Sequence, residues 1–178
     1  DMIHGRVQNG FHGAEICFPK ISVGATENVI LAAVLAKGKT RIFRAAKEPE
    51  VVALCQYLVQ CGAEIKGIGT DCLIIQGVEQ LCGCSMKIPA DRIVAGTYLF
   101  AVLAAGGSAW LEEAPCNEMG AVLQVANQMG AICQESSNGL YVQAPEELQA
   151  LIYLQTGEYP GFPTDLQSAV TVSALRAK

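Results

Sequence analysis

Residues 31–42 read "LAAVLAKGKTRI", and residues 99–110 read "LFAVLAAGGSAW". Both stretches give a leucine-rich helix end, then a glycine and then a short strand. The correspondence continues without a gap from "EPEVVALCQYLVQCGAEI" at 48–65 to "CNEMGAVLQVANQMGAIC" at 116–133. Two stretches of one chain that match over this length indicate an internal repeat, and this repeat decides the fold.

A third match completes the repeat. The stretch "DCLIIQGVEQL" at 71–81 aligns with "NGLYVQAPEEL" at 138–148, at an offset of 67 residues rather than the 68 of the earlier matches. Each repeat reads as strand, helix, strand, helix, strand, strand. One βαβαββ module covers only part of its sheet, so we expect it to pack with copies of itself. The sequence therefore predicts an α/β fold with two full units and the start of a third.

The first unit shows the pattern most clearly. We expect its strands at 13–18, 40–44, 63–67 and 72–76, and its helices at 22–37 and 49–61. The apolar residues of the second helix are predicted to share one stripe: Val51, Val52, Leu54, Cys55, Leu58 and Val59. Gly62 follows as the expected C-terminal cap, because glycine readily adopts the left-handed conformation that ends many helices.

A third unit begins before the sequence ends. We expect its first strand at 151–156, "LIYLQT", and its first helix at 166–178, "LQSAVTVSALRAK". The sequence stops inside this predicted helix. We therefore expect these 178 residues to be a piece of a longer protein, with exposed module faces that favour self-association.

The composition limits the class of protein. About half of the residues are apolar (51%) and 16% are charged, which excludes a disordered chain. A net charge of −5 argues against a nucleic acid or an anionic membrane as partner. No apolar stretch reaches the roughly 18 to 20 residues that span a bilayer.

The eight cysteines form no recognisable metal motif. There is no CxxC, and the closest pair, Cys82-Gly-Cys84, has no histidine cluster near it to complete a zinc site. We therefore expect small buried thiols in a reducing cytosol, and no metal.

Five motifs follow one another along the chain: "SVGATEN" at 22–28, "AAKEPEV" at 45–51, "GAEIKGIGTD" at 62–71, "IPADRIVAGTYL" at 88–99 and "YPGFPTDLQ" at 159–167. Together they resemble the UDP-N-acetylglucosamine 1-carboxyvinyltransferase family of enolpyruvyl transferases. The resemblance implies an inside-out α/β barrel of two lobes, each with three βαβαββ units about a pseudo-threefold axis. It makes residues 1–87 the last unit of one lobe, and residues 88–178 the first unit and the start of the second unit of the other.

The resemblance also implies a reaction. The family transfers enolpyruvyl from phosphoenolpyruvate to the 3-hydroxyl of UDP-N-acetylglucosamine and releases phosphate, which is the first committed step of peptidoglycan synthesis in the cytoplasm. It implies no metal and no organic cofactor. The family's reactive cysteine lies upstream of the matched region, and Cys116, the repeat equivalent of Glu48, does not replace it. We therefore expect this chain alone to be inactive.

The segment from Lys20 to Gly24 leads into the first helix. The start of a helix leaves backbone N–H groups unpaired and carries a partial positive charge, so it attracts anions. Ser22 is able to cap it, and Gly24 lets a ligand approach the backbone. The local pattern fits an ordinary capped helix as well as an anion site. The resemblance implies the second, with Lys20, Ser22, Val23 and Gly24 holding the UDP diphosphate.

Asp165 precedes the last predicted helix in "FPTD". Locally it reads as the N-cap, with Pro163 setting the turn. The resemblance implies that its carboxylate contacts the 3-hydroxyl of the sugar as a candidate general base. It also makes the neighbouring Thr164 a contact to the sugar or the uridine.

Three further residues are implied to lie near the active cleft. Asp91 and Arg92 in "PADRI" read locally as a helix cap and an ion-paired cation on the surface. Glu48 precedes a helix that begins at Pro49, a place where acids are favoured. The resemblance puts all three beside the cleft, with Glu48 as an ionic partner.

Two other functions remain open. The chain could come from a related transferase that acts on shikimate 3-phosphate, which would require different contacts to the acceptor. It could also belong to a binding protein that keeps the repeats and has lost catalysis. The retained Lys20, Ser22 and Asp165 argue against the second.

Overall fold

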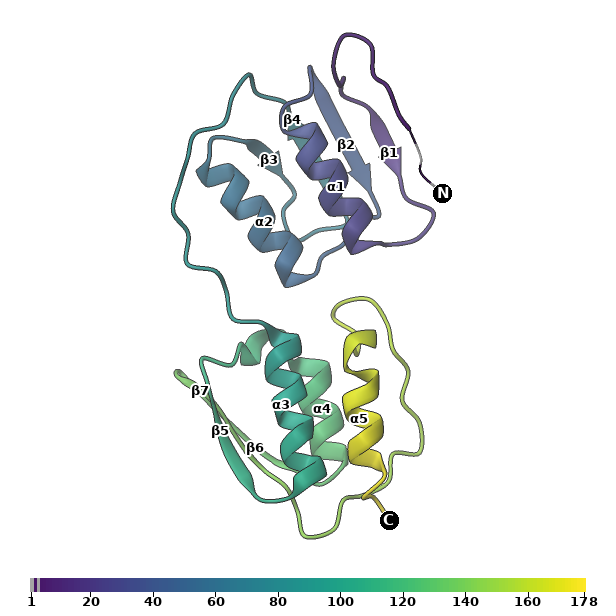
Figure 1. The fold of residues 1–178 in the computed structure, drawn as a ribbon, viewed down its shortest axis with the longest axis vertical. Coiled ribbons are helices and arrows are strands. Elements are labelled where there is room, and N and C mark those ends of the chain that lie inside the picture. The colour runs from purple at the N-terminus through teal and green to yellow at the C-terminus, as the bar shows by residue number, and fades with distance from the viewer. Residues whose placement is uncertain (1, 3) are drawn as a thin grey trace. The chain divides into compact units, whose positions relative to one another are not determined.

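A computed structural model describes residue 2 and residues 4–178 of the chain. The chain forms two compact units, Asp1–Ile88 and Pro89–Lys178, each with its own hydrophobic core (Figure 1). No helix of the described residues is both long and apolar enough to cross a membrane.

The first unit has the βαβαββ order that the repeat predicts. Its elements are β1 (Glu15–Cys17), α1 (Val23–Ala33), β2 (Lys39–Phe43), α2 (Pro49–Gln60), β3 (Glu64–Lys66) and β4 (Cys72–Gln76). The sheet order is β1-β2-β4-β3. Strands β1 and β2 are parallel, and β4 pairs antiparallel with both β2 and β3.

Both helices of the first unit cover the same face of this sheet (Figure 1). Burial alternates along β2 and β4, as expected for strands with one covered face. Ile42 pairs with Leu73, and both side chains are buried under the helices. The opposite face is exposed and carries the ion pair between Arg41 and Glu15, with 2.9 Å between nitrogen and oxygen.

Helix α2 ends as its sequence predicts. Gly62 has φ of +101°, and its amide donates to the carbonyl oxygen of Val59 at 3.0 Å. The amide of Ala63 donates to the carbonyl oxygen of Leu58 at 2.9 Å, which completes a Schellman motif. The predicted apolar stripe of α2 wrongly included Val59. Val59 is 41% exposed, because it lies at the edge of the apolar face defined by the buried Val51, Cys55 and Leu58.

The second unit repeats much of this order. Its elements are α3 (Arg92–Ala105), β5 (Ser108–Glu112), η1 (Cys116–Glu118), α4 (Gly120–Gln128), β6 (Ile132–Ser136), β7 (Gly139–Gln143), η2 (Thr164–Leu166) and α5 (Gln167–Ala174). The sheet order is β5-β7-β6, and both pairings are antiparallel. The same Schellman motif ends α4, because Gly130 donates to Asn127 and Ala131 donates to Ala126, both at 3.0 Å. The predicted fold class, mixed α/β with repeated units, is confirmed.

Two predicted strands do not form. Within the described residues, no strand lies between β4 and α3, so the second unit lacks the opening strand of the repeat. The stretch 151–156 is also not a strand, and only Thr156 makes an isolated bridge, to Phe162. Leu151 and Leu154 of that stretch still pack against the core. A strand needs a neighbour for its backbone hydrogen bonds, and the described residues supply none there.

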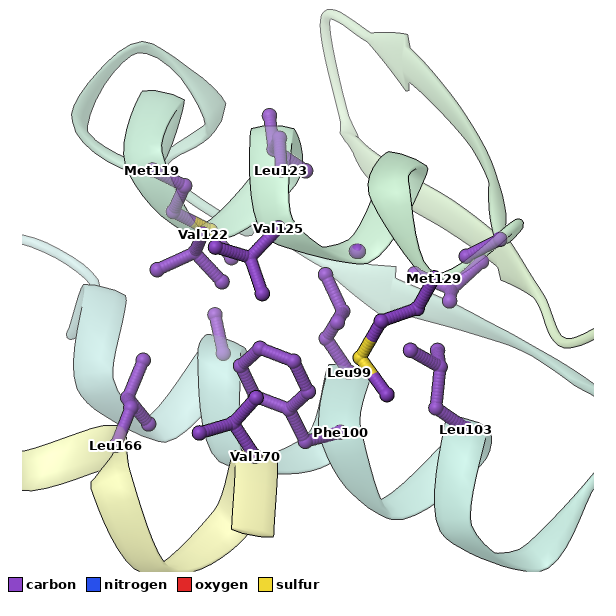
Figure 2. Close-up of a cluster of buried hydrophobic side chains, with 14 of the residues drawn as sticks. Leu99, Phe100, Leu103, Met119, Val122, Leu123, Val125, Met129, Leu166 and Val170 are labelled. Atoms are coloured by element: carbon purple, nitrogen blue, oxygen red, sulfur yellow. The ribbon is translucent and has the colours of Figure 1, made fainter. Parts of the chain in front are cut away.

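Helix α3 lies at the centre of the second unit. Figure 2 shows Leu99, Phe100 and Leu103 of this helix facing side chains from α4 and α5. Met129 reaches toward Leu99 and Leu103, and Val170 of α5 lies beside the ring of Phe100. These side chains form one continuous buried cluster, which fixes the three helices against one another.

Helices α3 and α5 pack parallel to each other. Leu166 meets Gly96 near the start of both helices. Further along α3, the Ser173 hydroxyl donates to the carbonyl oxygen of Phe100 at 2.8 Å, and Arg176 donates to that of Leu103 at 2.6 Å. Helix α5 ends at Ala174 rather than continuing to Lys178 as the sequence predicts.

Candidate functional site

The first turn of α1 is an open helix mouth. Ser22 is the N-cap, and its Oγ accepts a hydrogen bond from the amide of Ala25 at 3.3 Å. Within the described chain, the amides of Val23 and Gly24 have no hydrogen-bond acceptor. Ser22 and Gly24 are exposed, and a Cβ built on Gly24 meets no atom within 4 Å. Two backbone donors at the positive end of the helix therefore face open space.

Three cationic residues lie in the segments next to this mouth. Lys20 is exposed, and its ammonium group has no acidic partner among the residues that the structure describes. Arg44 lies directly after β2 with φ of +57°, and its guanidinium donates to the carbonyl oxygen of Pro19 at 3.0 Å. Lys47 follows three residues later in the same connection. Neither Arg44 nor Lys47 was predicted as a site residue, although both follow a predicted strand that is parallel to β1, where ligand sites of α/β sheets are found.

Glu48 lies beside the same end of the first unit. It is the N-cap residue of α2, but its side chain makes no capping hydrogen bond, and it is only 7% exposed. The amide of Ala46, two residues earlier, donates to Thr26 in the first turn of α1. The structure therefore brings Glu48 and the segment from Lys20 to Gly24 to one end of the unit, at the carboxyl ends of the parallel strands β1 and β2.

In the second unit, Asp91 caps α3 as predicted. One oxygen of its carboxylate accepts hydrogen bonds from the amides of Ile93 at 2.7 Å and Val94 at 3.3 Å. Arg92 is not the surface cation that the local pattern predicts, because it is only 8% exposed. Its guanidinium carbon lies 5.4 Å from the centre of the Tyr159 ring, a distance typical of a cation–π contact. Tyr159 begins the "YPGFPTD" stretch and was not predicted as a site residue.

Thr164 and Asp165 are both exposed, in the short helix η2 ahead of α5. The prediction that Asp165 is an N-cap was wrong, because neither η2 nor α5 is capped by a side chain. In the described part of the chain, the Asp165 carboxylate has no ion pair and accepts no hydrogen bond. The next residue, Leu166, is fully buried against α3 and so fixes the backbone of Asp165.

The helices of the second unit bring these residues together. The N-terminal ends of α3, α4 and α5 lie at one end of the unit (Figure 1). Asp91 and Arg92 stand at the first of these ends, and Thr164 and Asp165 stand just before the last. The candidate residues thus form two groups, one in each unit.

The cysteines of the described chain are free thiols. Burial raises the pKa of the Cys55 thiol to about 11. Burial, with a smaller effect of the nearby Glu135 carboxylate, raises the pKa of Cys133 to about 11. The same two causes raise the pKa of Cys116, so none of these three is an activated thiolate at neutral pH. Among the described residues, no cluster of three or more His, Cys, Asp or Glu side chains is arranged for a metal ion.

Named relatives cover most of this chain. It is 41% identical over 176 residues to a UDP-N-acetylglucosamine 1-carboxyvinyltransferase of Beijerinckia indica, and the match covers 99% of this chain and 41% of the relative. The enzyme of the same name from Zymomonas mobilis is 45% identical over 159 residues, which cover 89% of this chain and 37% of the relative. The chain thus spans about two fifths of the length of these curated relatives.

Solved structures share its fold. The enolpyruvyl transferase NikO from Streptomyces tendae matches with a TM-score of 0.76 at 19% identity, over 87% of this chain and 37% of that protein. An EPSP synthase structure from Acinetobacter baumannii matches with a TM-score of 0.57 at 20% identity, over 80% of this chain and 34% of that protein.

The family model of EPSP synthase (3-phosphoshikimate 1-carboxyvinyltransferase) matches residues 3–178. This match takes in both units and every candidate residue described above. The likeness to NikO, at 19% identity, concerns the fold alone. The chain therefore belongs to the EPSP synthase family.

Proposed function

We propose that this chain is part of a UDP-N-acetylglucosamine 1-carboxyvinyltransferase. The whole enzyme transfers the enolpyruvyl group of phosphoenolpyruvate to the 3-hydroxyl of UDP-N-acetylglucosamine and releases phosphate. The relatives that carry this name are 41% to 45% identical to the chain over most of its length. The reaction serves peptidoglycan synthesis in the cytoplasm, and it uses no metal or organic cofactor.

The observation that carries the proposal is the open mouth of α1. A diphosphate needs several donors and positive charge, and it binds well at helix N-termini. Val23 and Gly24 offer two unengaged amides, Ser22 adds a hydroxyl, and Lys20 adds an exposed ammonium group. We assign these four residues to the diphosphate of the UDP-sugar.

Asp165 is the proposed general base. A base for the sugar hydroxyl must be a carboxylate that the substrate can reach and that no internal partner neutralises. Asp165 is exposed and has no ion pair in the described chain, while the buried Leu166 holds its backbone in place. Thr164, beside it, is proposed to contact the sugar or the uridine.

Glu48, Asp91 and Arg92 are proposed to line the cleft. Burial of Glu48 and Arg92 fixes their side chains, which suits positioning rather than free movement. Asp91 holds the first turn of α3 and thereby sets the position of Arg92. These roles go beyond the capping and surface roles that the local sequence predicts.

The chain by itself is proposed to be inactive. It spans about two fifths of its relatives, and catalysis needs groups that hold phosphoenolpyruvate as well as the UDP-sugar. An assay of enolpyruvyl transfer with the 178-residue chain tests this directly. Turnover above the uncatalysed rate would contradict it.

The diphosphate site is tested by titrating UDP-N-acetylglucosamine into the longer protein that contains this chain. Lys20→Ala should weaken binding about 10- to 100-fold, since a charge-assisted hydrogen bond contributes roughly 1.5–3 kcal/mol. Lys39→Ala is the matched control, because Lys39 is an exposed lysine at the start of β2, outside the mouth of α1. Calorimetry gives the dissociation constant for each variant.

If the wild type and Lys20→Ala bound UDP-N-acetylglucosamine with equal affinity, the assignment of Lys20 to the diphosphate would be wrong. Shikimate 3-phosphate is titrated in parallel, because the family model takes its name from the enzyme that uses this acceptor. Binding of shikimate 3-phosphate without binding of the UDP-sugar would favour that alternative. Binding of the UDP-sugar without turnover in the longer protein would favour a binding protein.

A further inference from the structure

Two cysteines far apart in the sequence meet in the first unit. The Sγ atoms of Cys61 and Cys84 are 2.9 Å apart, although 23 positions separate the residues. A disulfide bond has a sulfur–sulfur distance of about 2.05 Å, so the two sulfurs need to approach by only about 0.9 Å. Among the described residues, no other two cysteine sulfurs lie within hydrogen-bonding distance of each other.

The backbone around this pair holds it in place. Cys61 is the C-cap of α2, and its own amide donates to the carbonyl oxygen of Tyr57 at 3.0 Å. The amide of Cys82 donates back to the carbonyl oxygen of Cys61 at 2.8 Å. The Cys84 thiol donates a hydrogen bond to the carbonyl oxygen of Tyr57, with 3.7 Å between sulfur and oxygen. The segment that carries Cys84 is therefore anchored to the last turn of α2 on both sides of Gly83.

Exposure gives the two thiols different chemical roles. Cys84 is partly exposed, so a small reagent reaches its sulfur. Cys61 is buried, with 4% exposed, so a reagent reaches its sulfur less readily. The first thiol to react is therefore Cys84, and Cys61 is placed to react with it afterwards.

We propose that Cys61 and Cys84 form a reversible disulfide, with a low-molecular-weight disulfide as the oxidant. Within the first unit, Cys61 ends α2 whereas the candidate residue Glu48 begins it, and the proposal does not depend on the enzyme activity. It assigns a function to two cysteines that the transferase reaction does not use.

The exchange proceeds in two steps. Cys84 loses its proton to water, and its thiolate attacks one sulfur of the oxidant, which breaks the S–S bond and releases one thiolate. Cys61 then loses its proton and attacks the Cys84 sulfur, forming the Cys61–Cys84 bond and releasing the second thiolate. The protein loses two electrons and two protons, and the oxidant becomes two thiols.

The bond would close the loop between residues 61 and 84 and fix the segment after β4 to the end of α2. A cross-link of this kind restricts the unfolded chain more than the folded one. The hydrogen bond with Cys61 raises the pKa of the Cys84 thiol, so Cys84 carries less thiolate at neutral pH and reacts more slowly than an ordinary surface thiol.

The test exposes the folded 178-residue chain to glutathione buffers of increasing oxidised fraction. Free thiols are then blocked, and non-reducing tryptic peptides are sequenced by mass spectrometry. Cleavage at Lys47, Lys66 and Lys87 separates the two cysteines, so their bond joins peptides 48–66 and 67–87. We expect this link to form, the free-thiol count to fall by two, and the thermal unfolding midpoint to rise. Reduced glutathione should reverse all three changes.

Two serine variants separate this bond from its alternatives. Cys84→Ser should prevent the link and the change in midpoint. Cys82→Ser is the matched control, because Cys82 is exposed and two residues away, and this variant should form the link as the wild type does. A link that persists in Cys84→Ser, a stable glutathione adduct on Cys84, or no link at any buffer ratio would overturn the proposal.

Discussion

The buried hydroxyl of Thr26 accepts a hydrogen bond from the amide of Ala46 at 3.0 Å. The same hydroxyl donates to the carbonyl oxygen of Ser22 at 2.7 Å. One side chain thus connects the capped first turn of α1 with the segment that enters α2. It fixes the position of the proposed diphosphate site relative to Glu48, without itself being exposed to a ligand.

Thr26→Val should lower the free energy of unfolding by about 1–3 kcal/mol. Valine keeps the shape of threonine but leaves the amide of Ala46 buried without an acceptor. Thr97→Val is the control, because the exposed Thr97 hydroxyl only donates within its own helix, to Ile93 at 2.8 Å. The control should change stability by less than about 0.5 kcal/mol. Urea unfolding followed by circular dichroism measures both, and equal effects would contradict the role of Thr26.

Two of the helical glycines, Gly96 and Gly24, should respond oppositely to alanine. A Cβ on Gly96 would lie 2.5 Å from Cδ1 of the fully buried Leu166, so Gly96→Ala should cost about 1–3 kcal/mol. A Cβ on Gly24 meets nothing within 4 Å, so Gly24→Ala should leave stability unchanged or raise it by up to about 1 kcal/mol.

Thermal and urea unfolding of the two variants test this contrast. Gly24→Ala offers a second measurement in the longer protein, because the new methyl group would stand beside the open amides of α1. We expect weaker binding of UDP-N-acetylglucosamine in a protein that folds normally. Tight binding by that variant would argue that the sugar nucleotide does not approach this helix.

The thiols should differ widely in reactivity toward iodoacetamide at pH 8. The pKa of Cys55 and of Cys133 is about 11, so only about 0.1% of each is thiolate at that pH. Cys17 and Cys82 are exposed and should be labelled first. Because these pKa values are raised, labelling of Cys55 and Cys133 should increase about tenfold for each pH unit up to about pH 11. Mass spectrometry of quenched samples follows each site, and early labelling of Cys55 would show that α2 opens more readily than its packing implies.

Asp165→Asn should lower turnover of the longer protein by about 100-fold or more while UDP-N-acetylglucosamine still binds. The amide keeps the size of the carboxylate but does not accept a proton, and general-base catalysis contributes about 10²- to 10⁴-fold. Stability should change by less than about 0.5 kcal/mol, because the side chain is exposed. Steady-state kinetics and calorimetry measure the two effects. Near-normal turnover would assign the base to another residue.

The repeat in the sequence predicted the order of elements because each element has a local cause. Gly62 and Gly130 end their helices at equivalent places, with φ of +101° and +89°. The alternation of buried and more exposed side chains along β2 and β4 set which face of the sheet is covered. The stretch 151–156 failed as a strand although its residues favour one, because strand formation depends on a neighbour that the local pattern does not contain.

The candidate residues also divide into those whose local role was predicted from the sequence and those whose role depends on tertiary contacts. Asp91 was predicted as a cap from its place before an apolar run, and its carboxylate does cap α3. Asp165 occupies a similar place but caps nothing, because the chain enters α5 through the turn η2. Arg92 was predicted on the surface and is buried beside Tyr159, a residue 67 positions away in the sequence.

The sequence by itself determined the repeated unit, its helix caps and the two segments that carry the candidate residues, since these follow from backbone preferences and periodic burial over a few residues. Only the tertiary structure decided which distant groups meet: Thr26 with Ala46, Arg92 with Tyr159, and Cys61 with Cys84. The reason is physical. Such contacts depend on how whole helices pack on a sheet, and no short stretch of sequence contains that information.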